Sequence, residues 1–352
     1  MKIGNKQVTQ EGPPVFIADI GANHDGSLER AFKLIELAAE SGADAAKFQN
    51  FSADLIVSKY GFDNLGDKLD HQSDWKKTVY ETYKDASISN DWTFKLKNKC
   101  NEFGIEYFTS PYDFQSVKNV LNFVNWIKIG SGDITWHEII EFISKQNKNI
   151  ILATGASDIN DVKRAVDLIC NNHKTFVLMQ CNTNYTGKEE NFKFINLNVL
   201  NLYKKMFPKL ILGLSDHTEG DATVLGALAL GARVFEKHFT DDNSRSGPDH
   251  KFAMNPKTWK SMVKNANRLF NSFGNGSKVV EENEKDTFLI QRRGIWLKNN
   301  IMKNDYIKRD DIIPLRPQKI DGFSANQIKD LIGKQVKHDL KANEYVRKED
   351  IL

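Results

Sequence analysis

Residues 210–217 read LILGLSDH, and the fold of the whole chain can be worked out from this stretch. An apolar run leads through Gly213 to three polar residues, and a helix-like run opens near Asp221. The order is therefore a buried strand, a polar tip and a helix. Because side chains alternate faces along a strand, Ser215 and His217 are predicted to share one face while Asp216 takes the other.

Residues 232–239, ARVFEKHF, repeat this pattern. Glu236 and His238 are predicted to share one face, and Lys237 between them to point toward the helical layer. Two histidines and a carboxylate at the carboxyl ends of successive strands form a donor set that suits manganese, iron, cobalt or zinc. We take His217 and His238 as candidate metal ligands. The alternative is that each is a hydrogen-bonded structural histidine.

Upstream of this pair, the same unit of apolar strand and amphipathic helix recurs. In the first helix, Ala31, Leu34, Ile35, Ala38 and Ala39 are predicted to form one apolar face. Eight parallel strands joined by helices favour a closed (β/α)8 TIM barrel, with an open doubly wound sheet as the alternative. The six further strands are VFIADIGAN (15–23), ADAAKFQ (43–49), IEYFTSPYD (105–113), WIKIGSGD (126–133), NIILATGA (149–156) and TFVLMQCN (175–182).

The chain is predicted to divide into a barrel domain over residues 1–272, a linker over 273–290 and a small β-rich domain over 291–352. The linker is rich in Gly, Ser and Asn and then becomes acidic. The small domain contains an internal repeat, because DYIKRDDII (305–313) matches EYVRKEDIL (344–352). Two copies of so short a unit indicate a pseudo-symmetric module rather than a solenoid.

One long connection interrupts the barrel pattern, from residue 51 to about residue 90. It is polar and aromatic, with Tyr60, Phe62, His71, Trp75 and Tyr83 among its residues. It follows the second strand and so lies on the face where barrel enzymes carry their active sites. The connection can be interpreted either as a lid or binding loop or as a plain insertion.

Composition excludes several classes of protein. The chain has 49 basic and 46 acidic side chains, interspersed, so nothing indicates a nucleic-acid partner. Its three cysteines, Cys100, Cys170 and Cys181, are widely spaced and fit neither a disulfide framework nor a CxxC metal site, so a reducing cytoplasm is expected. No apolar run reaches the roughly 18 residues that span a bilayer, so no membrane association is expected.

Lysines and hydroxyls also collect at the predicted carboxyl ends of the strands. Lys47 and Lys128 stand at two strand ends, beside Ser110, Ser131 and Ser215. Two ammoniums ringed by hydroxyl donors make a site for a compact anion such as phosphate or carboxylate. With a metal, the site suits a phosphorylated acid and a carbonyl compound. Schiff-base aldolase chemistry is the alternative, and it needs one amine with a depressed pKa and no metal.

Eight motifs carry a resemblance to a known family. IADIGANHDGS, KFQ, TSPYD, KIGSGDI, NTNY, GLSDHT, GARVFEKHFT and GPDH, in this order, resemble the sialic acid synthase family of N-acetylneuraminate and other nonulosonate synthases. The small domain resembles the family's antifreeze-like SAF domain. The resemblance implies condensation of phosphoenolpyruvate with N-acetylmannosamine or a related acetamido sugar, with phosphate released by C–O cleavage. It also implies a divalent metal, manganese first and magnesium or cobalt next, and a domain-swapped homodimer.

The resemblance assigns roles to individual residues. His217 and His238 match the metal ligands, while Asp25 matches the acid/base residue and Glu236 a second carboxylate beside the metal. Arg316 matches an arginine that reaches the sugar from the partner subunit. The remaining substrate-binding matches are Lys47, Gln49, Ser110, Lys128, Ser131, Asn184, Tyr185 and Ser215.

Some positions depart from the family pattern and leave the acceptor sugar open. Gln180 replaces a histidine, Asn182 a threonine, Thr186 a proline and Ala153 a serine. N-acetylmannosamine, its 6-deoxy diacetamido analogue and other modified hexosamines all remain candidates. A non-enzymatic carbohydrate-binding or ice-binding role would leave the clustered lysines, carboxylates and histidines without a task.

Overall fold

Eight parallel strands close into a barrel in the computed structural model, which describes residues 1–66, 72–73 and 75–352. The chain divides into two compact units, Met1–Phe273 and Gly274–Leu352, and each is described by itself. Closure of the barrel by pairing of the last strand with the first confirms the predicted TIM barrel and excludes the open sheet. In order, the strands are β3 (Val15–Asp19), β4 (Ala45–Asn50), β5 (Glu106–Pro111), β6 (Trp126–Ile129), β7 (Asn149–Ala153), β8 (Val177–Cys181), β9 (Ile211–Asp216) and β10 (Val234–His238).

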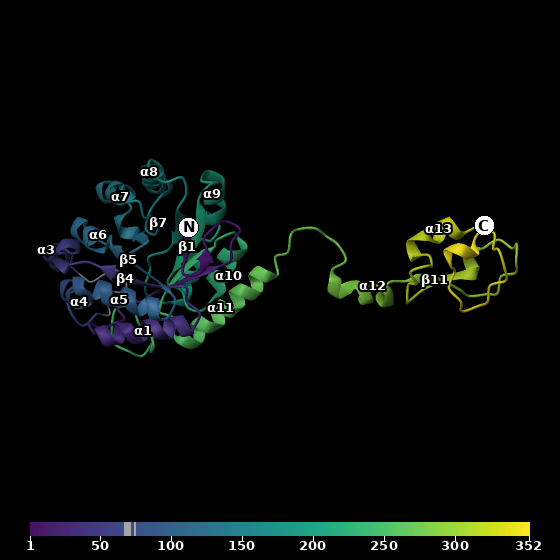
Figure 1. Ribbon diagram of the computed structural model, residues 1–352, viewed down its shortest axis with the longest axis horizontal. Helices are drawn as coiled ribbons and strands as arrows, with labels where there is room; N and C mark the ends of the chain where they lie inside the picture. The colour runs from purple at the N-terminus through teal and green to yellow at the C-terminus, as the bar shows by residue number, and fades with distance from the viewer. Residues whose placement is uncertain (67–71, 74) are drawn as a thin grey trace. The chain divides into compact units, whose positions relative to one another are not determined.

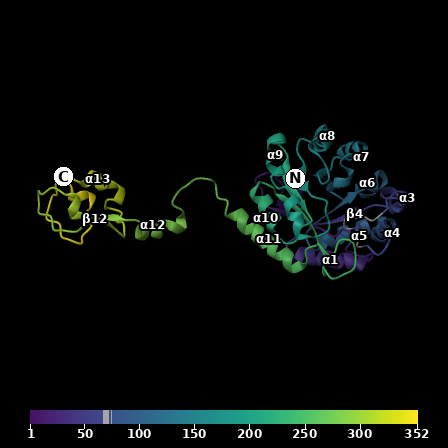
Figure 2. The same cartoon turned by 180° about the vertical axis from the view of Figure 1, so that it is seen from behind.

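Helices surround the barrel on its outer side, as Figure 1 shows from one side and Figure 2 from behind. The first is capped by Ser27, whose side chain accepts a hydrogen bond from the backbone N–H of Arg30, and it buries Ala31, Leu34 and Ile35 as the pattern predicts. The barrel unit's α-helices are α1 (Leu28–Glu40), α2 (Ala53–Ile56), α3 (Lys59–Asp63), α4 (Val79–Ala86), α5 (Asn90–Glu102), α6 (Phe114–Val120), α7 (His137–Ser144), α8 (Ile159–Cys170), α9 (Val199–Met206), α10 (Ala222–Ala229) and α11 (Pro256–Asn271). Short 3₁₀ helices lie at η2 (Ser131–Asp133) and η3 (Glu189–Phe194).

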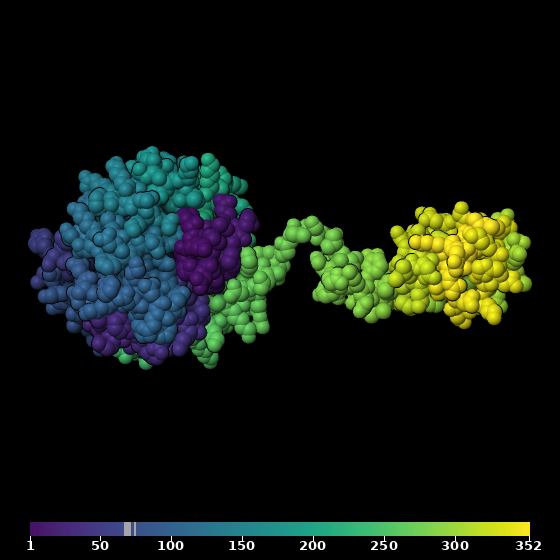
Figure 3. All heavy atoms as spheres, viewed as in Figure 1, coloured from purple at the N-terminus to yellow at the C-terminus, as the bar shows by residue number. Residues whose placement is uncertain are grey.

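A short N-terminal hairpin, β1 (Lys2–Ile3) with β2 (Lys6–Gln7), lies at the amino-end side of the barrel. The indole N–H of Trp126, the first residue of β6, donates to the carbonyl of Lys2 at 2.6 Å. Figure 3 shows these first residues, in the darkest purple, packed on the surface of the barrel unit. The amino ends are thus covered by chain, whereas the polar residues gather at the carboxyl ends.

Over its described residues, the long connection after β4 carries the α-helices α2, α3 and α4. Residues 67–71 and 74 lie outside the described residues, and so does the predicted loop residue His71. Trp75, Thr82, Tyr83 and Ala86 from this connection line the main cavity of the barrel. In the part of the chain that the structure describes, the connection therefore forms a wall of the cavity, which favours a binding loop over a plain insertion.

The second unit has its own small core and shows the predicted repeat in three dimensions. Asn304 and Asn343 both have φ of 72°, and each stands immediately before the first residue of its repeat copy. Each copy also ends in a capped 3₁₀ turn, η5 (Arg309–Asp311) and η7 (Lys348–Asp350). The unit's other elements are η4 (Glu282–Glu284), α12 (Lys285–Gln291), β11 (Gly294–Leu297), β12 (Ile312–Leu315), η6 (Ala325–Gln327) and α13 (Ile328–Leu331). Among the described residues, no helix is long and apolar enough to cross a membrane.

Candidate active site

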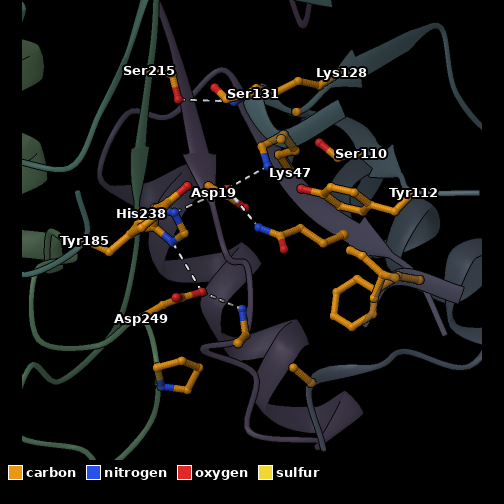
Figure 4. A pocket seen from close by; sticks show the side chains of 18 of the residues that line it. Asp19, Lys47, Ser110, Tyr112, Lys128, Ser131, Tyr185, Ser215, His238 and Asp249 are labelled. Carbon is orange, nitrogen blue, oxygen red and sulfur yellow. Dashed lines mark hydrogen bonds and ion pairs between the residues drawn. The ribbon is translucent and has the colours of Figure 1, made fainter. Parts of the chain in front are cut away.

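A cavity of about 380 Å³ lies at the carboxyl ends of the barrel strands (Figure 4). The alternation of faces along β9 and β10 is as predicted: Ser215, His217, Glu236 and His238 line this cavity, while Asp216 and Lys237 pair with each other on the other side of the sheet. The residues predicted for the site that line it are Lys47, Gln49, Ser110, Lys128, Ser131, Tyr185, Ser215, His217, Glu236 and His238.

Two buried ammoniums lie in the cavity, and each is paired with a carboxylate. Lys47 Nζ donates to Asp19 Oδ2 at 2.6 Å and lies 3.8 Å from Glu236 Oε1. Lys128 Nζ donates to Glu236 and, at 3.2 Å, to Ser215 Oγ. Since an ammonium carries three donors, Lys47 keeps further hydrogen-bonding capacity toward a ligand.

Electrostatics keep the ion pair between Lys47 and Asp19 charged. Burial works against both charges, yet Lys47, His238 and Lys128 hold the pKa of Asp19 below its ordinary value. Burial likewise opposes the ammonium, but Asp19 and Glu236 raise the pKa of Lys47 above its ordinary value. A Schiff-base lysine needs the opposite shift, so this lysine is unsuited to aldolase chemistry.

The two histidines lie side by side at the cavity wall. Their ring centroids are 5.4 Å apart, and the ring of Tyr185 packs on His217 at 4.2 Å. His217 Nδ1 lies 2.8 Å from the backbone carbonyl of Asn182, so Nδ1 carries the hydrogen and Nε2 keeps its lone pair. Burial, with help from His238, lowers the pKa of His217 to about 3, so this ring is the neutral form that binds metals.

His238 lies between two carboxylates. Its Nε2 is 3.6 Å from Asp19 Oδ2, and its Nδ1 is 3.5 Å from Asp249 Oδ2. Burial lowers the pKa of His238, but Asp19 and Asp249 outweigh it and raise the pKa overall. Both distances exceed those of good hydrogen bonds, so the ring is held mainly by charge.

These residues fit a divalent metal with two protein ligands. His238 Nδ1 and Glu236 Oε2 are buried and have no hydrogen-bond partner within the described residues, and such buried atoms are rare in native proteins. Among the described residues that line the cavity, four carry carboxyl groups, Asp19, Asp133, Glu236 and Asp249, and two carry ammoniums. No group of three or more His, Cys, Asp or Glu side chains arranged to hold a metal is found over residues 1–66, 72–73 and 75–352. Water or substrate oxygens would have to complete the coordination.

Asp25, predicted as the acid/base residue, lies elsewhere. It lines a second, outer cavity of about 910 Å³ and is not among the residues that line the inner one. Its Oδ2 accepts from Arg245 at 2.7 and 3.0 Å, and its Oδ1 lies 2.9 Å from His250 Nε2. Burial raises the pKa of Asp25, but His250 and Arg245 outweigh it and lower the pKa overall. A carboxylate held in this way is poorly suited to donating a proton.

Two further predicted residues do not line the inner cavity. The side chain of Asn184 faces its own loop, where Oδ1 accepts from Thr186 Oγ1 at 2.6 Å and from Asn191 Nδ2 at 3.0 Å. Arg316 belongs to the second unit, where it is exposed.

Comparison with known proteins shows the family of the chain. The sequence model of the NeuB family matches residues 34–278, and that of the SAF domain matches residues 292–352. The chain belongs to the NeuB family. This confirms the resemblance inferred from the motifs and the nature of the second unit.

Relatives of this NeuB family chain match it over nearly its whole length. It is 34% identical to the N,N'-diacetyllegionaminic acid synthase of Campylobacter jejuni, covering 95% of this chain and 98% of the relative. It is 32% identical to the enzyme of that name from Legionella pneumophila, with coverage of 93% and 91%. Among solved structures, the spore coat polysaccharide biosynthesis protein SpsE of Bacillus subtilis is 28% identical, with a TM-score of 0.66 and coverage of 100% and 99%.

The departures from the NeuB pattern fall mostly outside the inner cavity. Gln180 points away from it and donates to the carbonyl of Ile195 at 2.9 Å. Asn182 accepts a hydrogen bond from His217 through its backbone carbonyl, and a threonine at this position would supply the same group. Ala153 is buried in the core. Thr186 lines the outer cavity, so it is the departure that faces ligand space.

Several residues that line the inner cavity were not assigned by sequence reasoning, among them Asp19, Tyr112, Asp133, Cys181 and Asp249. Asp249 lies in the quoted GPDH motif, and its Oδ2 accepts from the backbone N–H of Ala22 at 3.0 Å. Gly21 permits this approach, because a Cβ there would lie 2.7 Å from Asp249 Oδ2. Asp19 could have been predicted as a site residue, because it is a carboxylate at the carboxyl end of the first barrel strand.

Proposed function

We propose that this protein is a nonulosonic acid synthase that condenses phosphoenolpyruvate with an N-acetylated hexosamine and releases inorganic phosphate. One observation carries the proposal: Ser110 Oγ, Glu236 Oε2 and His238 Nδ1 are buried and accept or donate no hydrogen bond in the described structure, and all three residues line the cavity that holds Lys47 and Lys128. Unpaired buried donors and acceptors that converge on one cavity indicate a polar ligand.

In this proposal, the phosphate and carboxylate of phosphoenolpyruvate bind to Lys47, Lys128 and the three serines. The raised pKa of Lys47 supports this, because its ammonium stays charged at neutral pH. Ser131 Oγ already accepts from the backbone N–H of Gly155 at 2.9 Å, which orients its own hydrogen for donation. Nothing in this set is placed to attack phosphorus, so the phosphate leaves as an intact anion by C–O cleavage.

His217 and His238 are proposed to hold a divalent cation, with Mn²⁺ favoured by the imidazole and oxygen donors. The excess of carboxylates over ammoniums in the cavity supports a cation there. When bound, it would supply Lewis-acid polarisation of the acceptor's aldehyde oxygen. The ring of Tyr185 packs on both histidines and would orient them to hold the cation.

Arg316 is proposed to reach the acceptor bound by a partner subunit, in a domain-swapped homodimer. In the second unit it is flanked by exposed apolar side chains, with Leu315 at 41% and Ile320 at 79% exposure. Apolar surface around an exposed arginine suits a protein contact. A cytoplasmic location is also proposed, in keeping with the free cysteines Cys100, Cys170 and Cys181.

The function is tested by measuring phosphate release. The full chain with Mn²⁺ and phosphoenolpyruvate is expected to release phosphate only when an N-acetylated hexosamine is added, and ¹⁸O at the bridging position is expected in that phosphate. Label retained in the sugar acid would mean P–O cleavage. The proposed reaction would be contradicted if no acetamido hexosamine in a panel caused phosphate release. It would also be contradicted if phosphate were released in the absence of any acceptor.

Asp133 is predicted to act as the general base in the cavity. Burial raises its pKa to about 6, so it is ionised at neutral pH and becomes protonated as the pH falls through that value. If it accepts a proton from the water that adds at C2, kcat is expected to fall below about pH 6. Asp133→Asn is expected to lose about 10²–10⁴-fold in kcat and to lose this acid limb.

The measurement is a pH profile of phosphate release for the wild type and for Asp133→Asn. Glu190→Gln, which alters an exposed carboxylate on η3, serves as the matched control and is expected to keep the wild-type profile. An unchanged acid limb in Asp133→Asn would assign the proton transfer to another group.

A further inference from the structure

We propose that Arg245 determines acceptor specificity by donating hydrogen bonds to an uncharged acetamido oxygen of the sugar in the outer cavity. This inference rests on the proposed function and names the part of the substrate that the outer cavity receives. The outer cavity adjoins the inner one, because they share lining residues. These are Ala22, Trp75, Thr82, Ala86, Tyr185 and Pro248. An acceptor whose aldehyde lies in the inner cavity therefore extends into the outer one.

The guanidinium of Arg245 is held in place by Asp25. Its Nε and Nη2 donate to Asp25 Oδ2 at 3.0 and 2.7 Å. The same carboxylate lies 3.1 Å from Arg30 Nε and accepts from His250 Nε2 at 2.9 Å. His250 is 0% exposed and is oriented in turn by Thr240 Oγ1, 2.7 Å from its Nδ1. A carboxylate fixed from three sides is a rigid support for the arginine.

The loop that carries Arg245 is also well ordered by hydrogen bonds. Asn243 Nδ2 donates to the carbonyls of His250 and Ala253 at 2.9 and 2.7 Å, and the backbone N–H of Ser244 donates to Asp242 Oδ1 at 2.8 Å. Arg245 therefore lines the outer cavity from a defined position, with its side chain 41% exposed. Preorganised donors of this kind contribute most to discrimination between ligands.

Arg245 keeps donors for a ligand. A guanidinium has five N–H groups, and the contacts with Asp25 use Nε and Nη2. Within residues 1–66, 72–73 and 75–352, Nη1 makes no hydrogen bond to the protein. Its N–H groups are thus available to a ligand, and Arg245 lines the outer cavity.

The chemistry of the wall favours an amide over an anion. The charge of Arg245 is balanced by Asp25, so it acts as a hydrogen-bond donor more than as a net cation. Phe252, Pro248 and Ala22 supply apolar surface in the same cavity. An acetamido group offers both a carbonyl oxygen for the guanidinium and a methyl group for that surface.

A phosphate on the acceptor is the competing ligand. Lys76 and Lys251 also line the outer cavity, and Lys77, which is paired with Asp85, completes that basic edge. The two ligands differ in what they require of Arg245. The binding of a phosphate would be strengthened by the three lysines as well as by Arg245. The binding of an acetamido group would depend on the guanidinium of Arg245 alone.

The test compares three acceptors, N-acetylmannosamine, its 6-deoxy 2,4-diacetamido analogue and its 6-phosphate, with wild type, Arg245→Met and Arg245→Lys. The wild type is expected to prefer the diacetamido sugar by about tenfold or more in kcat/KM. Arg245→Met is expected to raise KM for that sugar by about 10–100-fold and to leave KM for phosphoenolpyruvate unchanged, because one charged donor is lost. Lysine is expected to restore part of the loss. Arg268→Met, an exposed arginine on α11, is the matched control.

A double-mutant cycle of Arg245→Met with Asp25→Asn distinguishes direct contact of Arg245 with the acceptor from an effect of the ion pair alone. If Arg245 contacts the acceptor and Asp25 supports it, Arg245→Met is the more damaging single change, and Asp25→Asn adds little to it because the two residues act as one unit. A larger loss in Asp25→Asn than in Arg245→Met would mean that Arg245 acts only through Asp25, and the proposal would fall. If the wild type preferred the 6-phosphate and Arg245→Met lost that preference, the ligand of Arg245 would be a phosphate and not an acetamido group. Wild-type kinetics in Arg245→Met would overturn this inference alone, whereas inactivity of the wild type with every acceptor would overturn the proposed function.

Discussion

Replacing His217 or His238 with alanine is expected to lower kcat/KM for the condensation by about a thousandfold or more. Lewis-acid polarisation is worth several kcal/mol in a transition state, and each 1.36 kcal/mol is a factor of about ten in rate. Both rings line the inner cavity, with centroids 5.4 Å apart, so losing either removes one of the two proposed protein ligands. Chelation of the wild type is expected to cause the same loss, reversed by Mn²⁺.

The experiment measures Mn²⁺ binding by calorimetry alongside phosphate release. His173→Ala is the matched control, because His173 bonds the carbonyl of Ser144 at 2.9 Å and is not among the cavity residues. Mn²⁺ affinity is expected to fall in His217→Ala and His238→Ala and to stay unchanged in the control. Full activity in metal-free buffer would contradict the metal assignment and reopen metal-free chemistry at Lys128.

Lys237→Met is expected to destabilise the barrel by about 3–5 kcal/mol, the cost of leaving one charge of a buried ion pair without its partner. Lys237 and Asp216 are each 2% exposed, and they pair in register between β10 and β9. Lys237 Nζ donates to Asp216 and, at 2.5 Å, to the carbonyl of Thr218. Thr223 on α10 donates to Asp216 at 2.7 Å, so the pair also ties the strands to a helix.

Urea denaturation of the full chain, followed through the transition of the barrel, measures this effect. Lys145→Met is the matched control: its ion pair with Glu141 is more than half exposed on both sides, so about 1 kcal/mol or less is expected. Asp216→Asn combined with Lys237→Met is expected to recover part of the loss, since no buried charge is then left unpaired. Equal effects in Lys237→Met and Lys145→Met would show that the buried pair carries no special stability.

Much of the site could be predicted because it depends on local rules. Alternation along a strand put Ser215, His217, Glu236 and His238 on one face, and the carboxyl-end rule for barrels brought Lys47 to the same cavity. Each of these placements follows from a residue's own strand. The repeat in the second unit was likewise visible in the letters, and its Asn304 and Asn343 share one backbone conformation.

The barrel, the family and ten of the residues that line the inner cavity could therefore be predicted from the sequence. The partners of those residues, in contrast, follow from the three-dimensional arrangement of the chain. Asp25 looked like an acid in an N-terminal motif, but Arg245 and His250, more than two hundred positions away, hold it as a carboxylate. Asp19 and Asp249 meet on either side of His238 for the same reason. Such partnerships arise where loops from the first and last strands of a closed barrel come together, and no local periodicity encodes that meeting.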